Sequence, residues 1–319
     1  MKEKVTRNKT IDFSIDEGKV YLDRCIMQKD LKADKDSIIN QFIIGDSFEI
    51  MEKLPEKFVD LLIVDPPYNL AKDYHGNKFN PKSREDYREY TISWLEKVIP
   101  LLKDTASIYV CCDWKSSLVI GDVLYNYFRV QNRITWQREK GRGAKNNWKN
   151  GMEDVWFATV GNTYTFNLDQ VKIRKKVNAP YRTAGKPKDW EETENGNFRN
   201  TCPSNFWDDI SIPYWSMSEN TAHPTQKPEK LLAKLILASS KEGDVVFDPF
   251  AGSGTTAVTA KKLGRNFVAI EQNALYGAWA QKRLEMADED SSIQGYCNGV
   301  FWERNSLAEQ KKAKKTFSS

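Results

Sequence analysis

Short apolar runs alternate along most of the chain with longer stretches whose apolar positions recur every three or four residues. The apolar runs predict strands at residues 41–46, 61–64, 106–112, 133–136, 245–247 and 266–270. The longer stretches predict amphipathic helices at residues 47–53, 84–103, 116–128, 229–240, 255–263 and 273–287. Strands that alternate with helices indicate an α/β fold, with the buried strands in a parallel sheet.

This alternation weakens between residues 150 and 222, where prolines interrupt any long element. Two apolar runs there, residues 155–160 and 163–166, are joined by Gly-Asn and predict a β-hairpin. We therefore expect an inserted region. Residues 1–40 are polar and weakly patterned, and no role is assigned to them. The tail from about residue 291 ends in a basic run and is expected to be unstructured.

Composition narrows the class of protein. The chain has 319 residues, enough for one large or two modest domains. Charged residues make up 29%, but the formal net charge is only +4, so the molecule as a whole is not strongly basic. A mean hydropathy of −0.64 and the lack of a long apolar run exclude a transmembrane helix. The charged amino terminus predicts no secretory signal, and five scattered cysteines without metal-ligand spacing predict reduced thiols in a cytoplasmic, metal-free protein.

The predicted strand at residues 61–64 ends in a motif that fixes an acid and an aromatic ring. Asp65, Pro66, Pro67 and Tyr68 follow the strand directly. Prolines cannot continue a sheet ladder, so the chain must leave the sheet there with a nearly fixed backbone. The acid and the ring are therefore expected at the carboxyl edge of the sheet, where open α/β folds bind their ligands.

A glycine turn at residues 248–254 follows the predicted strand 245–247 and leads into a predicted helix. Gly252 and Gly254 let a ligand approach the backbone and the amino terminus of that helix. With Ala257 they also fit G-x-G-x-x-A, the fingerprint of dinucleotide-dependent oxidoreductases, and that class of enzyme stays open on these facts.

Two acids around the glycine turn favour a different cofactor. Asp248 begins the turn, where it would repel a pyrophosphate but would suit a cation. Glu271 ends the next predicted strand, where a carboxylate can accept hydrogen bonds from ribose hydroxyls. S-adenosylmethionine is a nucleoside that carries a positively charged sulfonium, and it satisfies both acids.

Three motifs occur in an order that resembles the β group of the exocyclic-amino methyltransferases of DNA. They are Asp65-Pro66-Pro67-Tyr68, then His223-Pro224-Thr225-Gln226-Lys227-Pro228, then Phe250-Ala251-Gly252-Ser253-Gly254. The resemblance spans roughly residues 42–287. It implies an S-adenosylmethionine-dependent methyltransferase with a Rossmann-like sheet flanked by helices, a circularly permuted motif order and an inserted target-recognition region. The implied segments are an amino-terminal arm (1–40), a catalytic half (41–143), the target-recognition region (144–222), a cofactor-binding half (223–290) and a basic tail (291–319).

The resemblance also implies roles for single residues. Asp65 and the carbonyl of Pro66 would accept the two N–H groups of the target amine, with Pro67 fixing the backbone. Tyr68 would stack on the base, which must leave the duplex to be reached. The residues implied to surround the cofactor are Asp46, His223, Thr225, Lys227, Asp248, Phe250, Gly252, Gly254 and Glu271.

A basic segment at residues 133–149 is the candidate DNA contact. It holds six basic residues against a single acid, and glycines and tryptophans are interleaved with the charge. Such a composition is typical of a backbone that follows nucleic acid, so double-stranded DNA is the expected partner. The residues proposed to bind it are Arg138, Lys140, Arg142, Lys145, Trp148 and Lys149.

Two readings of the target base follow from the resemblance. An aspartate in the first position of the motif is most familiar in N6-adenine enzymes. Residues 136–143, 147–150 and 205–210, however, are similar to modification methylases that recognise CTAG, which are assigned to cytosine N4. We expect cytosine N4, within a restriction–modification system, with adenine N6 as the alternative. The resemblance also allows for a homodimer and for a cognate endonuclease that need not contact the chain.

A covalent cysteine mechanism is not expected. Cytosine C5 methylation uses a Pro-Cys pair, whereas this chain has Cys202-Pro203 in the reverse order. Cys111 and Cys112 lie at the end of a predicted strand, and these two residues and Cys202 are interpreted as small buried apolar residues.

Overall fold

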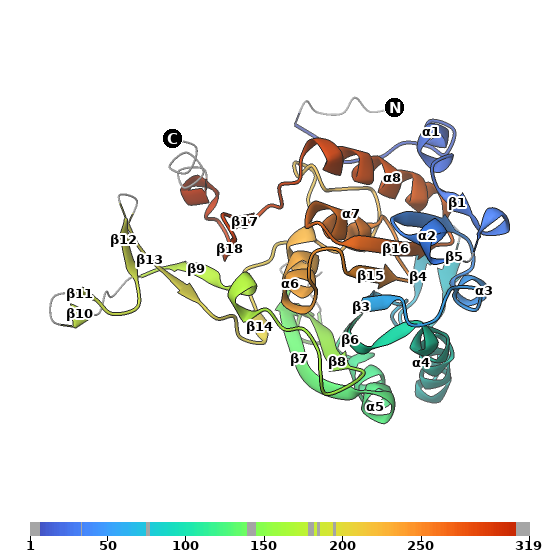
Figure 1. The fold of residues 1–319 in the computed structure, drawn as a ribbon, viewed down its shortest axis with the longest axis horizontal. Coiled ribbons are helices and arrows are strands. Elements are labelled where there is room, and N and C mark those ends of the chain that lie inside the picture. The colour runs from blue at the N-terminus through green and yellow to red at the C-terminus, as the bar shows by residue number, and fades with distance from the viewer. Residues whose placement is uncertain are drawn as a thin grey trace.

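A computed structural model describes residues 7–32, 34–74, 77–138, 145–177, 182–183, 186–193 and 196–310. These residues build a central sheet of nine strands (Figure 1). In sheet order the strands are β1 (Ile26–Met27), β2 (Gln41–Ile44), β16 (Asn266–Glu271), β15 (Val245–Asp248), β3 (Val59–Val64), β6 (Leu102–Cys112), β8 (Met152–Thr159), β7 (Arg129–Gln137) and β14 (Phe206–Trp207). The first six strands in this order, β1, β2, β16, β15, β3 and β6, are parallel, and β8 runs antiparallel to both β6 and β7. The sheet is therefore mixed, and the predicted α/β fold is confirmed.

Helices cover both faces of the sheet because its inner strands are apolar on both sides. In β3, Leu62 and Val64 pack on one face, whereas Leu61 and Ile63 pack on the other. One face carries α2 (Lys35–Ile38), α3 (Ser47–Met51), α4 (Arg84–Val98) and α5 (Ser117–Tyr127), and the other carries α6 (Glu229–Ser239), α7 (Thr255–Lys262) and α8 (Ala274–Glu289). Figure 1 shows α7 and α8 above the sheet and α4 and α5 below it.

The predicted helix at residues 84–103 ends early, and that boundary was wrong. Helix α4 stops at Val98 and continues only as the 3-10 turn η2 (Ile99–Leu101) before β6 begins at Leu102. Pro100 accounts for this, because it has no N–H to donate within a helix and its ring clashes with the preceding turn. Strand β6 is four residues longer at its start than the predicted strand at 106–112.

The predicted hairpin of residues 155–160 and 163–166 is also wrong. Strand β8 pairs with β6 on one side and β7 on the other, and residues 163–166 form no strand. Instead Tyr164 and Phe166 place their rings 6.0 and 5.9 Å from the ring of Phe157. Long partner strands from elsewhere in the chain replace the local pairing that the Gly-Asn turn suggested.

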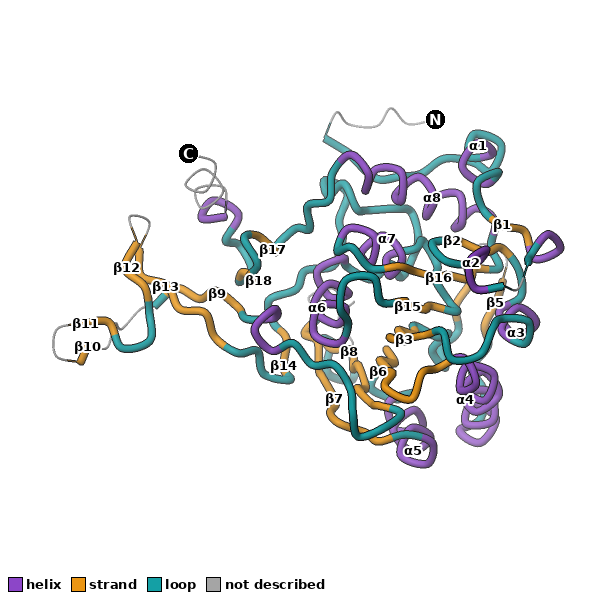
Figure 2. Tube along the Cα trace, in the orientation of Figure 1, coloured by secondary structure: helices purple, strands orange, loops and turns teal. Residues whose placement is uncertain are grey.

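A second sheet projects from the body of the molecule. Its order is β12 (Glu191–Thr193), β13 (Gly196–Thr201), β9 (Ile173–Lys176), β18 (Val300–Trp302) and β17 (Tyr296–Cys297), and β10 (Arg182–Thr183) pairs with β11 (Lys186–Pro187) beyond it. Figure 2 shows that this projection consists of strands and loops, whereas the long helices lie on the body. We call the five strands the projecting sheet.

The carboxyl-terminal part is more ordered than expected. Strand β18 pairs with β9 in parallel, so residues 296–302 complete the projecting sheet. The prediction of an unstructured tail from residue 291 is wrong for these residues, since apolar Phe301 and Trp302 are buried. The basic run at residues 311–315 lies outside the described residues.

The amino-terminal residues pack on the body. Helix α1 (Lys19–Leu22) and turn η1 (Gln28–Asp30) flank β1, which extends the central sheet beyond β2. Trp279 of α8 donates its indole N–H to the carbonyl of Phe13 at 3.2 Å. The smaller elements are η3 (Leu168–Val171) and the hairpin of β4 (Lys72–Tyr74) and β5 (Asn77–Phe79). No helix among the described residues is long and apolar enough to cross a bilayer.

Candidate active site at the carboxyl edge of the sheet

Four acids come together at the carboxyl ends of four adjacent parallel strands. Asp46 follows β2, Glu271 ends β16, Asp248 ends β15 and Asp65 follows β3. All four line one cavity of about 270 Å³, together with the D-P-P-Y motif and the glycine turn. The motifs at residues 65–68 and 248–254, far apart in sequence, therefore form a single site, as the sheet-edge argument predicted.

Both oxygens of Asp65 are engaged. The hydroxyl of Tyr68 donates to Oδ1 at 2.8 Å, and the ammonium of Lys227 donates to Oδ2 at 2.7 Å. Burial alone would lower the pKa of Lys227, but the charges of Asp65 and Glu153 outweigh it and hold the pKa above its ordinary value. Lys227, which the resemblance assigned to the cofactor, reaches across the cavity to the D-P-P-Y motif.

The prolines and the ring of the motif are held by neighbours. Pro66 is buried, and the carbonyl of Pro67 accepts a hydrogen bond from the hydroxyl of Tyr87 at 3.1 Å. Tyr68 is half-buried, with the ammonium of Lys227 5.1 Å from its ring centroid. Tyr68 lines the cavity, where a base could stack on its ring in the proposed role.

Glu153 is a functional candidate that the sequence did not reveal. It lies on β8, is 5% exposed, and its Oε2 faces Lys227 Nζ at 3.4 Å and the hydroxyl of Tyr68 at 3.3 Å. Its Oε1 accepts a hydrogen bond from the guanidinium of Arg138. The signal that could have found it is a pair of acids, Glu153 and Asp154, at the start of an apolar strand, because buried acids are rarely without a partner.

The glycine turn needs its glycines. Gly252 and Gly254 have φ values of +53° and +76°, which side-chain-bearing residues rarely adopt. A Cβ on Gly254 would lie 2.6 Å from the Cβ of Ala280, and one on Gly252 would lie 3.0 Å from Nε2 of His223. The turn thus packs closely on α8 and on the 223–228 segment. Phe250 packs edge-on against Trp94, with ring centroids 6.2 Å apart.

Burial raises the pKa of both carboxylates beside the turn, Asp248 and Glu271. Burial raises the pKa of Asp248 to about 7, although Thr256 and the N–H of Phe250 donate hydrogen bonds to it at 2.6 and 3.0 Å. Burial also raises the pKa of Glu271 above its ordinary value, while the N–H of Gly252 and the N–H of Asn273 donate to it at 2.8 and 2.9 Å. Each oxygen of an ionised carboxylate keeps a further lone pair, so both acids can still accept from a ligand.

The remaining cofactor candidates line the same cavity. Asp46 is exposed and caps α3, since its Oδ1 accepts from the N–H groups of Phe48 and Glu49 at 2.8 and 3.2 Å. The ring of His223 meets that of Tyr276 with centroids 4.4 Å apart, and its Nδ1 accepts from the N–H of Thr225 at 3.3 Å. Eight of the nine proposed cofactor residues therefore line the cavity, whereas Gly254 packs against Ala280 behind the turn.

The proposed DNA-binding residues lie near that edge as far as they are described. The loop between β7 and β8 leaves the carboxyl end of β7, which is the edge that holds the cavity. Trp148 is 92% exposed, and Lys145 and Lys149 beside it are exposed. Arg138 instead pairs with Glu153, and Lys140 and Arg142 lie outside the described residues.

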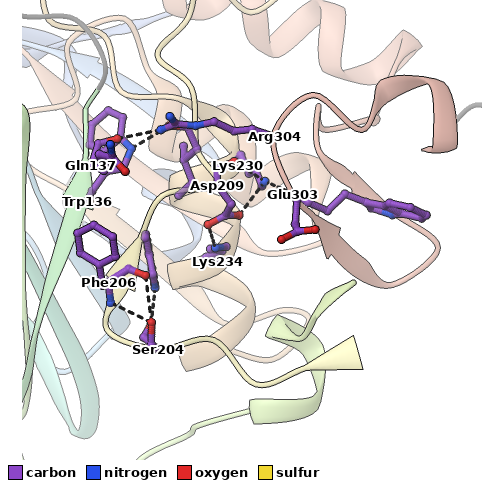
Figure 3. Close-up of polar contacts among 12 residues, drawn as sticks. Trp136, Gln137, Ser204, Phe206, Asp209, Lys230, Lys234, Glu303 and Arg304 are labelled. Atoms are coloured by element: carbon purple, nitrogen blue, oxygen red, sulfur yellow. Dashed lines mark hydrogen bonds and ion pairs between the residues drawn. The ribbon is translucent and has the colours of Figure 1, made fainter. Parts of the chain in front are cut away.

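A buried polar cluster joins the projecting sheet to the body (Figure 3). Asp209 bridges Lys230 and Lys234 of α6 at 2.7 and 2.6 Å, and Lys230 also donates to the carbonyl of Trp302. Burial lowers the pKa of Lys234 to about 8 although Asp209 opposes it. Arg304 donates to the carbonyls of Gln137 and Ile210 at 2.9 and 2.7 Å, which ties the chain after β18 to the end of β7.

The cysteine interpretation is confirmed for Cys111 and Cys112 but is wrong for Cys202, which is exposed because it follows the end of β13. Cys111 lines the cavity and Cys112 is buried beside it. Burial raises the pKa of both thiols well above the ordinary value, so neither is a thiolate at neutral pH.

Comparisons with known proteins agree with this geometry. Residues 59–282 match the family model N6_N4_Mtase, described as DNA methylase. The chain is 34% identical over 261 residues to the type II methyltransferase M.HpaI of Haemophilus parainfluenzae, covering 80% of this chain and 76% of the relative. It is 34% identical over 256 residues to the DNA adenine methyltransferase YhdJ of Escherichia coli strain K12, covering 78% and 84%. The solved structure named PvuII DNA methyltransferase (cytosine-N4-specific) shares the fold, with a TM-score of 0.57 at 18% identity, covering 84% of this chain and 95% of that one.

Proposed function

The chain belongs to the DNA methylase family whose model matches residues 59–282, and on that premise we propose that Asp65 and its neighbours activate an exocyclic amine of a base in duplex DNA. As a member of this family the chain is an S-adenosylmethionine-dependent DNA methyltransferase. The observation that carries the proposal is the cavity itself, because the D-P-P-Y motif and the glycine turn line one space of about 270 Å³.

The residues around the glycine turn fit the cofactor. Asp248 and Glu271 offer two carboxylates to a ligand that carries a sulfonium charge and ribose hydroxyls. Gly252, which has no side chain, lets the ligand approach the backbone, and His223 stands behind it. A pyrophosphate would place negative charge beside Asp248, which argues against the dinucleotide class of cofactor. When bound, S-adenosylmethionine supplies the methyl group.

The catalytic residues act on the amine. Its lone pair is delocalised into the ring, which makes the nitrogen a poor nucleophile. We assign Asp65 and the carbonyl of Pro66 to the two N–H groups, so that the nitrogen becomes more tetrahedral and its lone pair faces the methyl donor. The Asp65 carboxylate also stabilises the positive charge that develops on the nitrogen and accepts the proton that it sheds. Tyr68 is assigned to the face of the extruded base.

The first test is methyl transfer by the purified protein. Duplex DNA should gain labelled methyl groups from S-adenosylmethionine, and Asp65→Ala should reduce the rate about 100-fold or more, because the group that orients the amine is lost. Asp60→Ala is a matched control, since Asp60 lies at the opposite end of the same strand and pairs with Lys103 at 2.6 Å. Equal rates for Asp65→Ala and the control would contradict the mechanism.

For the target base we propose cytosine N4 within a short palindrome such as CTAG, as the modification half of a restriction–modification system. The likeness of residues 136–143, 147–150 and 205–210 to CTAG methylases supports it. Adenine N6 is the second candidate, favoured by the aspartate at position 65 and by the 34% identity to a protein named as a DNA adenine methyltransferase.

Methylation mapping distinguishes the two bases. DNA from a host that expresses the chain is expected to contain N4-methylcytosine in one short sequence, and to resist an endonuclease that cuts CTAG. Nucleoside mass spectrometry identifies the modified base directly. N6-methyladenine without N4-methylcytosine would exclude the cytosine assignment and leave the methyltransferase assignment intact.

A further inference from the structure

Two carboxylates at the candidate active site, the half-buried Asp65 and the buried Glu153, compete for the same two donors. Lys227 Nζ lies 2.7 Å from Asp65 and 3.4 Å from Glu153. The hydroxyl of Tyr68 lies 2.8 Å from Asp65 and 3.3 Å from Glu153. A phenol has one proton to donate, so a bond to one acid excludes a full bond to the other. In this arrangement both donors favour Asp65.

This arrangement occupies the group that must receive the substrate. One oxygen of Asp65 holds the hydroxyl of Tyr68 and the other holds Lys227. Each oxygen keeps a further lone pair, but an ammonium at 2.7 Å neutralises the carboxylate and makes it a weaker acceptor for the amine, so the bond to the substrate strengthens when a donor moves aside. A displaced ammonium needs another acceptor, because a buried charge without a partner is costly. Glu153 already faces both donors and is 5% exposed, so it can serve as that acceptor.

Arg138 links Glu153 to the proposed DNA contact. It belongs to the basic segment, and its guanidinium pairs with Oε1 of Glu153. While it does so, Arg138 and Lys227 balance the charges of Asp65 and Glu153. If a DNA phosphate attracts Arg138 away, the remaining three groups carry one net negative charge. That charge draws Lys227 towards Glu153 and favours the positive charge that develops on the target nitrogen.

We propose that Glu153 is a positioning residue that takes Lys227 and the Tyr68 hydroxyl from Asp65 when substrate arrives, and that Arg138 makes this exchange depend on DNA contact. Glu153 does not line the cavity, so it acts through Lys227 and Tyr68 and not on the amine itself. This inference rests on the proposed function, because it assigns Asp65 to the amine.

The test compares Glu153→Gln with Asp154→Asn in single-turnover methyl transfer at saturating DNA and S-adenosylmethionine. Asp154 is the matched control, since it is a neighbouring buried acid that accepts from Thr135 at 2.8 Å, outside the cavity. Glu153→Gln is expected to reduce the rate about tenfold or more, with the Kd values for DNA and cofactor and the melting temperature close to those of the control. A rate within about twofold of wild type would overturn the proposal.

Arg138→Gln is the second variant and remains informative if Glu153→Gln does not fold. It should weaken DNA binding, and its single-turnover rate at saturating DNA should fall by clearly less than the tenfold expected of Glu153→Gln, because Glu153 is then free to accept Lys227. A loss of rate at saturation as large as that of Glu153→Gln would indicate a structural role only and would overturn the proposal. If wild-type protein transfers methyl groups and Asp65→Ala does not, a failure of these expectations concerns Glu153 alone. If wild-type protein transfers none, the proposed function fails as well.

Discussion

At the scale of single residues, Asp248 is an acid of the cavity whose charge changes near neutral pH. Burial raises its pKa to about 7, and the charges of Asp65 and Glu271 add to the effect. Below this pH the protonated acid offers a cation no charge, whereas above it the carboxylate attracts the sulfonium. Affinity for S-adenosylmethionine should therefore rise between about pH 6 and pH 8, by at most about tenfold per pH unit for one proton released.

The product of methyl transfer provides the comparison. S-adenosylhomocysteine has the same nucleoside and amino acid but a neutral sulfur, so its affinity should depend less on pH. Calorimetric titration of both ligands at three pH values measures the difference, and Asp248→Asn should remove it. Parallel pH profiles for the two ligands would show that Asp248 does not interact with the sulfonium.

The residues of the D-P-P-Y motif and the glycine turn could be placed from sequence because their chemistry is local. Pro66 and Pro67 cannot continue a strand, and Gly252 and Gly254 adopt backbone angles that other residues avoid. Glu153 and the position of Lys227 could not be placed this way. The residues that contact them follow β3 (Asp65 and Tyr68) and β7 (Arg138), so these contacts depend on the order of the strands in the sheet.

On the scale of elements, the chain after β18 fixes the region that is expected to read DNA. Arg304 donates to two carbonyls, at the end of β7 and at residue 210 (Figure 3). Arg304→Ala leaves both carbonyls without this donor, which costs about 1–3 kcal/mol of local stability. DNA affinity should fall while cofactor affinity stays unchanged, because the cavity lies on other strands.

Fluorescence anisotropy with duplex DNA and calorimetry with cofactor measure these two affinities. Glu303→Ala is the control, because Glu303 is a partly exposed neighbour whose ion pair with Lys175 spans 3.7 Å and contributes little. If Arg304→Ala binds DNA as tightly as Glu303→Ala does, the carboxyl-terminal segment does not support DNA binding.

Helices and strands could be predicted where the local sequence pattern alone determines the secondary structure. The strands and helices predicted for the central sheet and its covering helices have the predicted types, whereas α1, β1 and α2 formed where none was predicted. Pro100 explains the helix end that was misplaced. The prediction of a hairpin at residues 155–166 was wrong because β8 pairs with the longer strands β6 and β7. The local sequence pattern does not determine which distant strands will pair. The ordered strands at residues 296–302 were missed for the same reason, since each is too short to be recognised without β9.

Across the whole molecule, the sheet order converts two distant motifs into one site. Asp65 and Asp248 end strands that are neighbours in space, because β15 pairs directly with β3. The catalytic and cofactor halves are thus one folded unit, and the predicted fold class followed from the alternation of strands and helices. The division into five segments remains a prediction.

Three strands of the projecting sheet lie within residues 144–222, which we expect to read the DNA sequence, and this bears on how new specificities would arise. These three strands come from residues 173–201 and the other two from residues 296–302, and part of the body, from β14 to α8, is encoded between them. A recombination event that exchanged only residues 144–222 with a relative would place a foreign β9 beside the original β18 and would disturb the ladder that the two strands share. To transfer a specificity from a relative, in evolution or in the laboratory, the gene segments for residues 173–201 and 296–302 would therefore have to be exchanged together.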